Sequence, residues 1–132
     1  MNARAIVKQL FVSSRPISWI NTAFPFGATY LFFTHSVDLT FVLGTLFFLV
    51  PYNLAMYGIN DVFDYESDLR NPRKGGIEGA LLDPKLHRIT LWASVLICAP
   101  FVAYLLLVGR ASATPMATNA MLAFALFTVV AY

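Results

Sequence analysis

Carboxylate and amide side chains recur at helical spacing near the middle of this 132-residue chain. At ~100° per residue of α-helix, they share one stripe that is roughly 100° wide. Its members are Asn53, Tyr57, Asn60, Asp61, Asp64 and Asp68. Glu66 points the other way and is expected to be solvated. Because carboxylates on one helix face repel one another, the stripe indicates a bound cation.

Oxygen ligands of this kind suit Mg²⁺, which is usually held by one or two carboxylates together with substrate phosphate oxygens. We therefore expect catalytic roles for Asp61, Asp64 and Asp68, and metal ligation by these three and Asn60. A solvated, acidic helix end is the alternative interpretation. The uncharged run that precedes Asp61 favours the metal site, because polar residues inside a membrane are functional candidates.

A basic segment follows the stripe, with Arg70, Arg73 and Lys74 around Pro72, which is expected to end the helix. These cations could clamp phosphate oxygens beside the metal. Positive charge at a cytoplasmic membrane boundary is an equally good explanation for Arg73 and Lys74, and the sequence leaves both open.

Long uncharged runs surround this polar region. Hydrophobic residues make up 58% of the chain, and 11 of its 16 charged residues lie between Asp61 and Arg88. Each of four runs has 21 or 22 residues, and ~20 residues of helix cross a hydrocarbon core. We predict an all-α integral membrane protein, a multi-helix transmembrane bundle. It forms one domain over residues 1–132, with spans 16–37, 39–60, 89–109 and 111–132 and a polar loop 61–88.

The distribution of Lys and Arg predicts how the bundle lies in the membrane. Three basic residues precede the first span and five lie in the 61–88 loop, whereas the opposite side has only Arg110. The positive-inside rule therefore places the N-terminus and the loop in the cytoplasm, as in a multi-pass protein of the cell membrane. Residues 3–14 fit a short amphipathic helix in the headgroup region or a frayed tail. A net charge of +2 gives no support to a nucleic-acid partner.

The motif Asn60-Asp61-x-x-Asp64-x-x-x-Asp68, at the end of a span, resembles the UbiA superfamily of intramembrane prenyltransferases. The stretch NDVFDYESDLRNPRKGGIEGALL, residues 60–82, looks most like actinobacterial members related to the lycopene elongases of C50 carotenoid biosynthesis. The preceding SRPISW, residues 14–19, adds weaker support. The chain resembles only the first four helices of that family, which carries a second Asp-rich motif further on.

The resemblance implies Mg²⁺-dependent transfer of a prenyl group from an allylic prenyl diphosphate to a lipophilic acceptor in isoprenoid biosynthesis. The acceptor would be a carotenoid such as lycopene, or a quinone precursor. Asp64 and Asp68 are assigned to metal, and Asn60 and Asp61 to metal or diphosphate support. The residues expected to bind substrate are Asn60, Asn53, Tyr57, Arg15, Asn21, Arg70, Arg73 and Lys74.

The facing Asp-rich motif of the family has no counterpart in these residues. The expected partner is therefore a second chain that carries it, alongside the two substrates and the lipid bilayer. We expect the chain to be a truncated or split product without detectable turnover on its own.

Two other classes of membrane protein share some of these features. The CDP-alcohol phosphotransferases also use clustered aspartates, but their Asp-Gly, Ala-Arg and Gly pattern does not precede Asp61. A non-catalytic membrane subunit or cation-binding helical bundle remains the alternative. An ion pathway would need further acids inside the spans, and the four spans contain none.

Overall fold

The computed structural model describes residues 2–75, 79 and 81–131, and no strand occurs among them. An all-α chain is therefore confirmed over the described residues. The helices are α1 (Ala3–Ser13), α2 (Trp19–Thr34), α3 (Leu39–Leu49), α4 (Pro51–Phe63), α5 (Tyr65–Asp68), α6 (His87–Arg110) and α7 (Pro115–Ala131). Single 3₁₀ turns, Pro16–Ser18 and Pro84–Leu86, precede α2 and α6.

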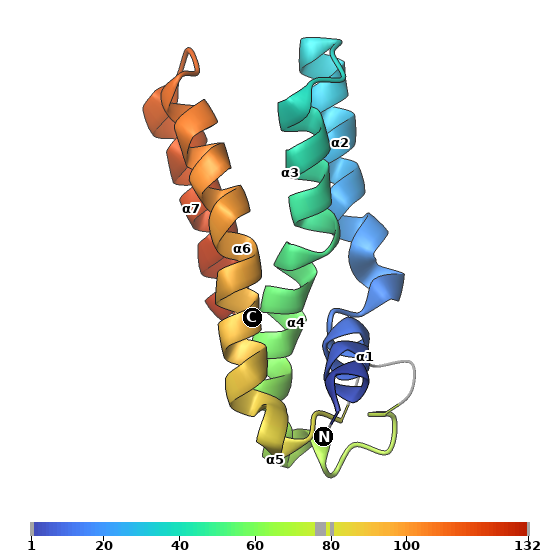
Figure 1. Ribbon diagram of the computed structural model, residues 1–132. Helices are drawn as coiled ribbons and strands as arrows, with labels where there is room; N and C mark the ends of the chain where they lie inside the picture. Colours follow the sequence, from blue (N-terminus) through green and yellow to red (C-terminus); the bar gives the residue numbers. More distant parts are fainter. Residues whose placement is uncertain (1, 76–78, 80, 132) are drawn as a thin grey trace.

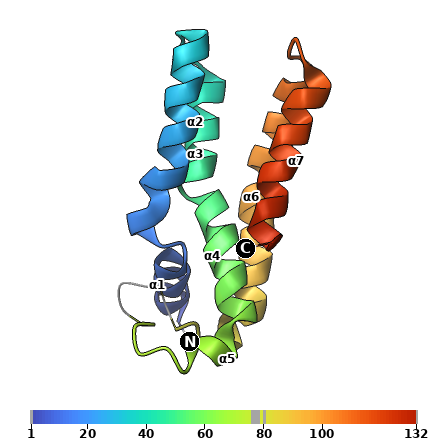
Figure 2. The same ribbon diagram turned by 180° about the vertical axis from the view of Figure 1, so that it is seen from behind.

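Two pairs of helices diverge from a common base (Figure 1). Helix α2 packs against α3, and α6 packs against α7, while α4 joins the pairs by packing along α6. Figure 2 shows the same arrangement from behind. Helices α1 and α5 both lie toward the base, and the α2–α3 and α6–α7 turns lie at the opposite end. The N-terminal helix and the acidic segment after α4 thus share one end of the bundle.

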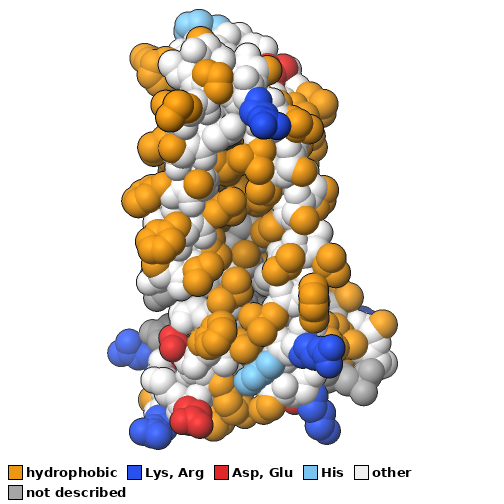
Figure 3. All heavy atoms as spheres, turned by 90° about the vertical axis from the view of Figure 1, so that its left-hand side faces the viewer, with side chains coloured by type: hydrophobic (Ala, Val, Ile, Leu, Met, Phe, Trp, Pro, Cys, Tyr) orange, Lys and Arg blue, Asp and Glu red, His pale blue; other side chains and the backbone are white. Residues whose placement is uncertain are grey.

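Within the described part of the chain, two segments are long and apolar enough to cross a membrane: Leu39–Phe63, with 25 residues, and Pro84–Arg110, with 27. They correspond to the predicted spans 39–60 and 89–109. The helices in the other two predicted spans are shorter, since α2 has 16 residues and α7 has 17. Hydrophobic side chains cover the length of the face shown in Figure 3, and the charged side chains lie toward its ends.

The segment predicted as one span over 39–60 consists of two helices that meet at Val50. Pro51 has no N–H to donate to the preceding turn, which bends the chain there. The side-chain nitrogen of Asn53 donates to the carbonyl oxygens of Phe48 (2.9 Å) and Leu49 (3.0 Å). The carbonyl groups beside the bend therefore have partners inside the bundle.

Close packing of aromatic and small side chains holds the pairs together. Phe47 is fully buried, and its ring stacks on that of Phe101 with centroids 6.1 Å apart. A Cβ on Gly58 would lie 3.0 Å from Cγ2 of Thr90, so the absent side chain lets α4 approach α6 closely. The first contact joins α3 to α6, and the second fixes α4, which carries most of the polar stripe, against α6.

The amphipathic pattern of residues 3–14 forms helix α1, which starts at the N-cap Asn2. One side of α1 packs on α4 and buries Ser13, while Val7 and Phe11 on the other side are exposed. A location of this helix in the lipid headgroup region stays a prediction.

Candidate functional site

A buried carboxylate, that of Asp61, lies at the centre of the base of the bundle. Its residue is 1% exposed, and three side chains from other parts of the chain reach it. Ser13 Oγ donates to Oδ2 at 2.7 Å, Lys74 Nζ donates to Oδ1 at 2.7 Å, and Arg15 Nη2 lies 3.4 Å from Oδ1. Both oxygens of the carboxylate are therefore engaged, and its buried charge is compensated.

Lys74 bridges two members of the polar stripe. Its Nζ lies 2.7 Å from Asp61 Oδ1 and 2.7 Å from Asp68 Oδ2. Partial burial lowers the pKa of Lys74, but the hydrogen bonds and negative charges of the two carboxylates outweigh it, and the pKa is raised overall. Lys74 thus stays protonated while it links α4, α5 and the segment that follows.

Arg15 reaches the site from the turn between α1 and α2. Its backbone adopts φ 48°, in the left-handed region, which reverses the chain after α1. The guanidinium carbon lies 4.2 Å from the centroid of the Tyr57 ring. Gly79 passes close by, because a Cβ there would lie only 2.9 Å from Arg15 Nε. Among the described residues, that buried Nε has no hydrogen-bond partner.

The lower part of the stripe is less buried than Asp61. Asp64 is at the surface, and Asp68 is partly buried against Lys74. The single helix expected through Asp68 is interrupted, because Asp64 ends α4 with φ −91° and ψ 10° before α5 begins. The interruption is small, since Asp64 N–H still donates to Asn60 O at 2.9 Å and Asp68 N–H to Asp64 O at 2.9 Å. Glu66 is exposed, as expected.

The remaining predicted site residues are not all brought to this cluster. The amide nitrogen of Asn53 is held 2.7 Å from Thr22 Oγ1 as well as by the carbonyl groups at the bend. Asn60 is partly buried on α4, whereas Asn21 on α2 is exposed. Arg70 and Arg73 are exposed after α5.

Mg²⁺ needs oxygen ligands in near-octahedral geometry. Among the described residues, no group of three or more His, Cys, Asp or Glu is placed to hold a metal ion. Asp64 nevertheless offers an exposed carboxylate, and one turn later Asp68 offers a partly buried one, of which one oxygen is paired with Lys74. One or two carboxylates plus substrate oxygens are the usual protein share of a magnesium shell. The chemistry of these two side chains therefore fits that ion, with a substrate supplying the other ligands.

Ser13 is the member of this cluster that sequence reasoning missed. It lies 48 positions before Asp61, and no helical periodicity connects the two. The only local sign is its place just before Arg15 and Pro16, where the chain must turn. Thr22 was missed for the same reason, because its contact with Asn53 exists only in the folded bundle.

Comparisons with known proteins show several relatives. The chain is 55% identical over 127 residues, 96% of its length, to the "C(50) beta-cyclic carotenoids biosynthesis protein LbtBC" of Dietzia sp. strain CQ4, of which it covers 28%. It is 58% identical over 103 residues, 78% of its length, to a lycopene elongase/hydratase of Corynebacterium glutamicum, of which it covers 36%. A lycopene elongase/hydratase of Halobacterium salinarum is 40% identical over 77 residues, 54% of this chain and 27% of that protein.

The chain is thus related to proteins of carotenoid biosynthesis and spans about a third of their length or less. No protein-family model matches it, and no solved structure matches it.

Proposed function

We propose that the chain supplies one Asp-rich half of a UbiA-like membrane prenyltransferase. This enzyme transfers a prenyl group from an allylic prenyl diphosphate to a lipophilic carotenoid acceptor such as lycopene. The supporting observation is that carboxylates suited to a metal and cations suited to phosphate converge at one end of an apolar bundle, through the Asp61–Lys74–Asp68 bridge. The relatives' printed names support the acceptor class.

In this proposal Asp61 is a positioning residue. Its oxygens are already used by Ser13, Arg15 and Lys74, so its role is to hold the two cations. Asp64 and Asp68 would hold Mg²⁺, which when bound neutralises charge on a diphosphate. The proposed set of metal ligands is smaller than the set expected from the sequence, in which Asn60 and Asp61 also bind the metal.

The cations Lys74 and Arg15 provide charge-assisted donors for the leaving diphosphate. The allylic C–O bond breaks and its electron pair leaves with the diphosphate. Electrons of an acceptor double bond then form the new C–C bond, and the resulting cation loses a proton or adds water. The bundle excludes bulk water from the apolar groups of both substrates.

A second Asp-rich segment outside these residues, on this polypeptide or on another chain, completes the site. Such a segment is needed because preorganised donors must surround the developing charge, and removing one commonly costs about 10²–10³ in rate. The membrane is the natural location, because the acceptor dissolves in lipid. The side of the membrane on which residues 61–88 lie is proposed to be the cytoplasm.

Equilibrium binding of a non-reactive prenyl diphosphate analogue to the chain in detergent micelles tests this assignment. Binding should depend on Mg²⁺, should weaken in Asp68→Asn and Lys74→Gln, and should be unaffected by Glu66→Gln on the solvated side of α5. An affinity that does not depend on Mg²⁺, or that changes equally in all three variants, would contradict the proposal.

A further inference from the structure

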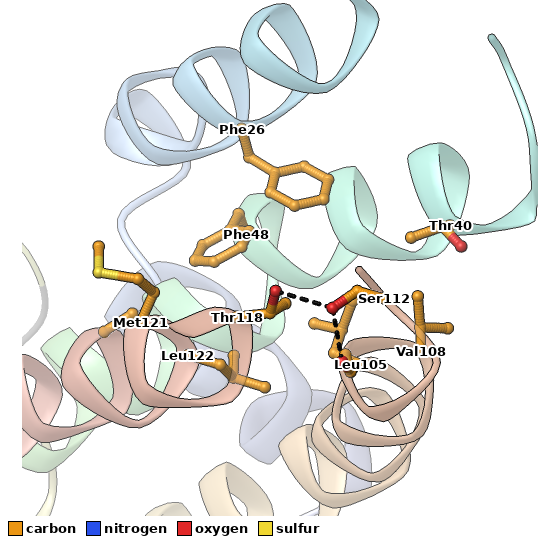
Figure 4. A pocket seen from close by; sticks show the side chains of 11 residues that line it. Phe26, Thr40, Phe48, Leu105, Val108, Ser112, Thr118, Met121 and Leu122 are labelled. Atoms are coloured by element: carbon orange, nitrogen blue, oxygen red, sulfur yellow. Dashed lines mark hydrogen bonds between the residues drawn. The ribbon is translucent and has the colours of Figure 1, made fainter. Parts of the chain in front are cut away.

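The charged cluster consists of Asp61, Asp68, Lys74 and Arg15 at the base of the bundle. The two helical pairs enclose a groove toward the opposite end of the bundle. The cavity has a volume of about 270 Å³ and lies between α2 and α3 on one side and α6 and α7 on the other. Figure 4 shows Phe26 and Phe48 facing Met121 and Leu122 across it. The groove opens along its lip at Met121, which is 67% exposed.

One residue connects this groove to the polar stripe. The carbonyl oxygen of Phe48, whose ring lines the groove, accepts from Thr22 Oγ1 at 2.6 Å and from Asn53 Nδ2 at 2.9 Å. Asn53 is the uppermost member of the stripe. Phe48 therefore contacts the upper end of the stripe through its backbone and the groove through its ring. At 1.5 Å per residue, about 20 Å along α3 and α4 separates Phe48 from Asp61.

The lining of the groove suits a flat, apolar chain. The rings of Phe26 and Phe48 lie 5.1 Å apart and tilted by 32°, so they present aromatic surface to an occupant. At the far end, Ser112 Oγ and Thr118 Oγ1 form a 3.0 Å hydrogen bond, and Ser112 also donates to Gly109 O at 2.7 Å. Each of the two hydroxyl groups thus has a hydrogen-bond partner in the protein, and the pair forms the polar end of the groove (Figure 4).

We infer that this groove holds the far arm of a long linear polyene acceptor while its near end reacts beside the charged cluster. The inference rests on the proposed function. The acceptor has two identical ends, so the end that is not reacting also needs a binding site. A rigid chain whose reacting end lies beside Asp61 extends to the level of Phe48. Elongation at the second end would then place an already extended arm in the groove.

Two alanines on α7 provide a matched test. Ala125 lines the groove, and Ala123 is exposed on the same helix without lining it. Lycopene is achiral, so an induced circular dichroism band in its visible absorption reports binding to the protein and not solution in lipid. The native chain and Ala123→Phe in phosphatidylcholine vesicles should give this band. Ala125→Phe should bind lycopene about tenfold more weakly, because the added ring overfills the groove.

Met121→Trp, at the exposed lip where the fold tolerates a large side chain, should weaken the band in the same way. Absence of the band from the native chain, as when lipid acyl chains fill the groove, would overturn the inference, as would equal bands in Ala125→Phe and Ala123→Phe.

Product analysis in lycopene-accumulating cells that also express the complementary Asp-rich segment separates this result from the proposed function. If the native chain forms no elongated product while the circular dichroism band of lycopene still depends on Ala125, the proposed function is wrong and the groove assignment stands. If elongation proceeds and Ala125→Phe gives the native ratio of singly to doubly elongated product, the groove assignment is wrong and the proposed function stands. The expected result is accumulation of singly elongated product in Ala125→Phe only.

Discussion

Ser13 Oγ donates a 2.7 Å hydrogen bond to Oδ2 of Asp61, and both side chains are buried. The bond ties the end of α1 to α4. Because Arg15 follows two residues later and folds back over Tyr57, this contact also determines where the Arg15 guanidinium lies. The N-terminal helix is thus part of the charged cluster and not an independent tail.

Replacing Asp61 with Asn should destabilise the base of the bundle. The substitution removes the charge that compensates Lys74 and Arg15, and breaking a buried ion pair costs about 3–5 kcal/mol. Since Lys74 keeps Asp68, we expect about 3 kcal/mol, measured as the free energy of unfolding in mixed detergent micelles. The exposed control Glu66→Gln should stay within about 0.5 kcal/mol. A loss of the same small size in Asp61→Asn would show that the buried cluster is not structural.

Replacing Asn53 with Leu should lower stability without changing affinity for a Mg²⁺-diphosphate analogue. The variant leaves the carbonyl oxygen of Leu49 without its side-chain donor and that of Phe48 with Thr22 as its side-chain donor, and an unpaired buried group costs about 1–3 kcal/mol. Asn21→Leu, at an exposed position of α2, is the matched control and should have little effect on stability. Reduced affinity in folded Asn53→Leu would restore the substrate-binding role expected from the sequence.

The bridge made by Lys74 should persist at alkaline pH. Its folded-state pKa is raised, so its contribution to stability is complete below the ordinary lysine pKa and is lost only as pH rises through the higher folded value. The difference in unfolding free energy between the native chain and Lys74→Gln should therefore stay constant from neutral pH up to that ordinary value. Lys8→Gln, on the exposed side of α1, serves as the control. A difference that disappears near neutral pH would contradict the assigned contacts.

Asp64→Asn and Asp68→Asn should each reduce prenyl transfer in the assembled enzyme by at least about 10²-fold, whereas Glu66→Gln should retain it. The reason is that Asp64 and Asp68 are the proposed metal ligands, while Glu66 points away from that site. The measurement is the initial rate in membranes that contain equal amounts of each variant. An equal loss of transfer rate in Glu66→Gln would contradict the assignment of Asp64 and Asp68, and not Glu66, to the metal site.

Local sequence patterns predicted part of this arrangement. Apolar length and helical periodicity placed the helices, and the same periodicity put Asn53, Asp61 and Asp68 on one side. The bend at Val50 follows from Pro51, which the sequence shows, whereas the interruption at Asp64 has no marker in the local sequence. The burial of Asp61 could not be predicted from the sequence either, because it depends on contacts with Ser13 and Lys74 from other segments of the chain.

The most direct test of the central proposal is transfer of an isotope-labelled allylic prenyl group to lycopene in membranes. The chain would be assayed alone and together with a polypeptide that carries a second Asp-rich motif. We predict no detectable product from the chain alone and Mg²⁺-dependent elongated carotenoid from the pair, abolished by Asp68→Asn. Robust transfer by the chain alone, or no transfer by a correctly inserted pair, would contradict the account.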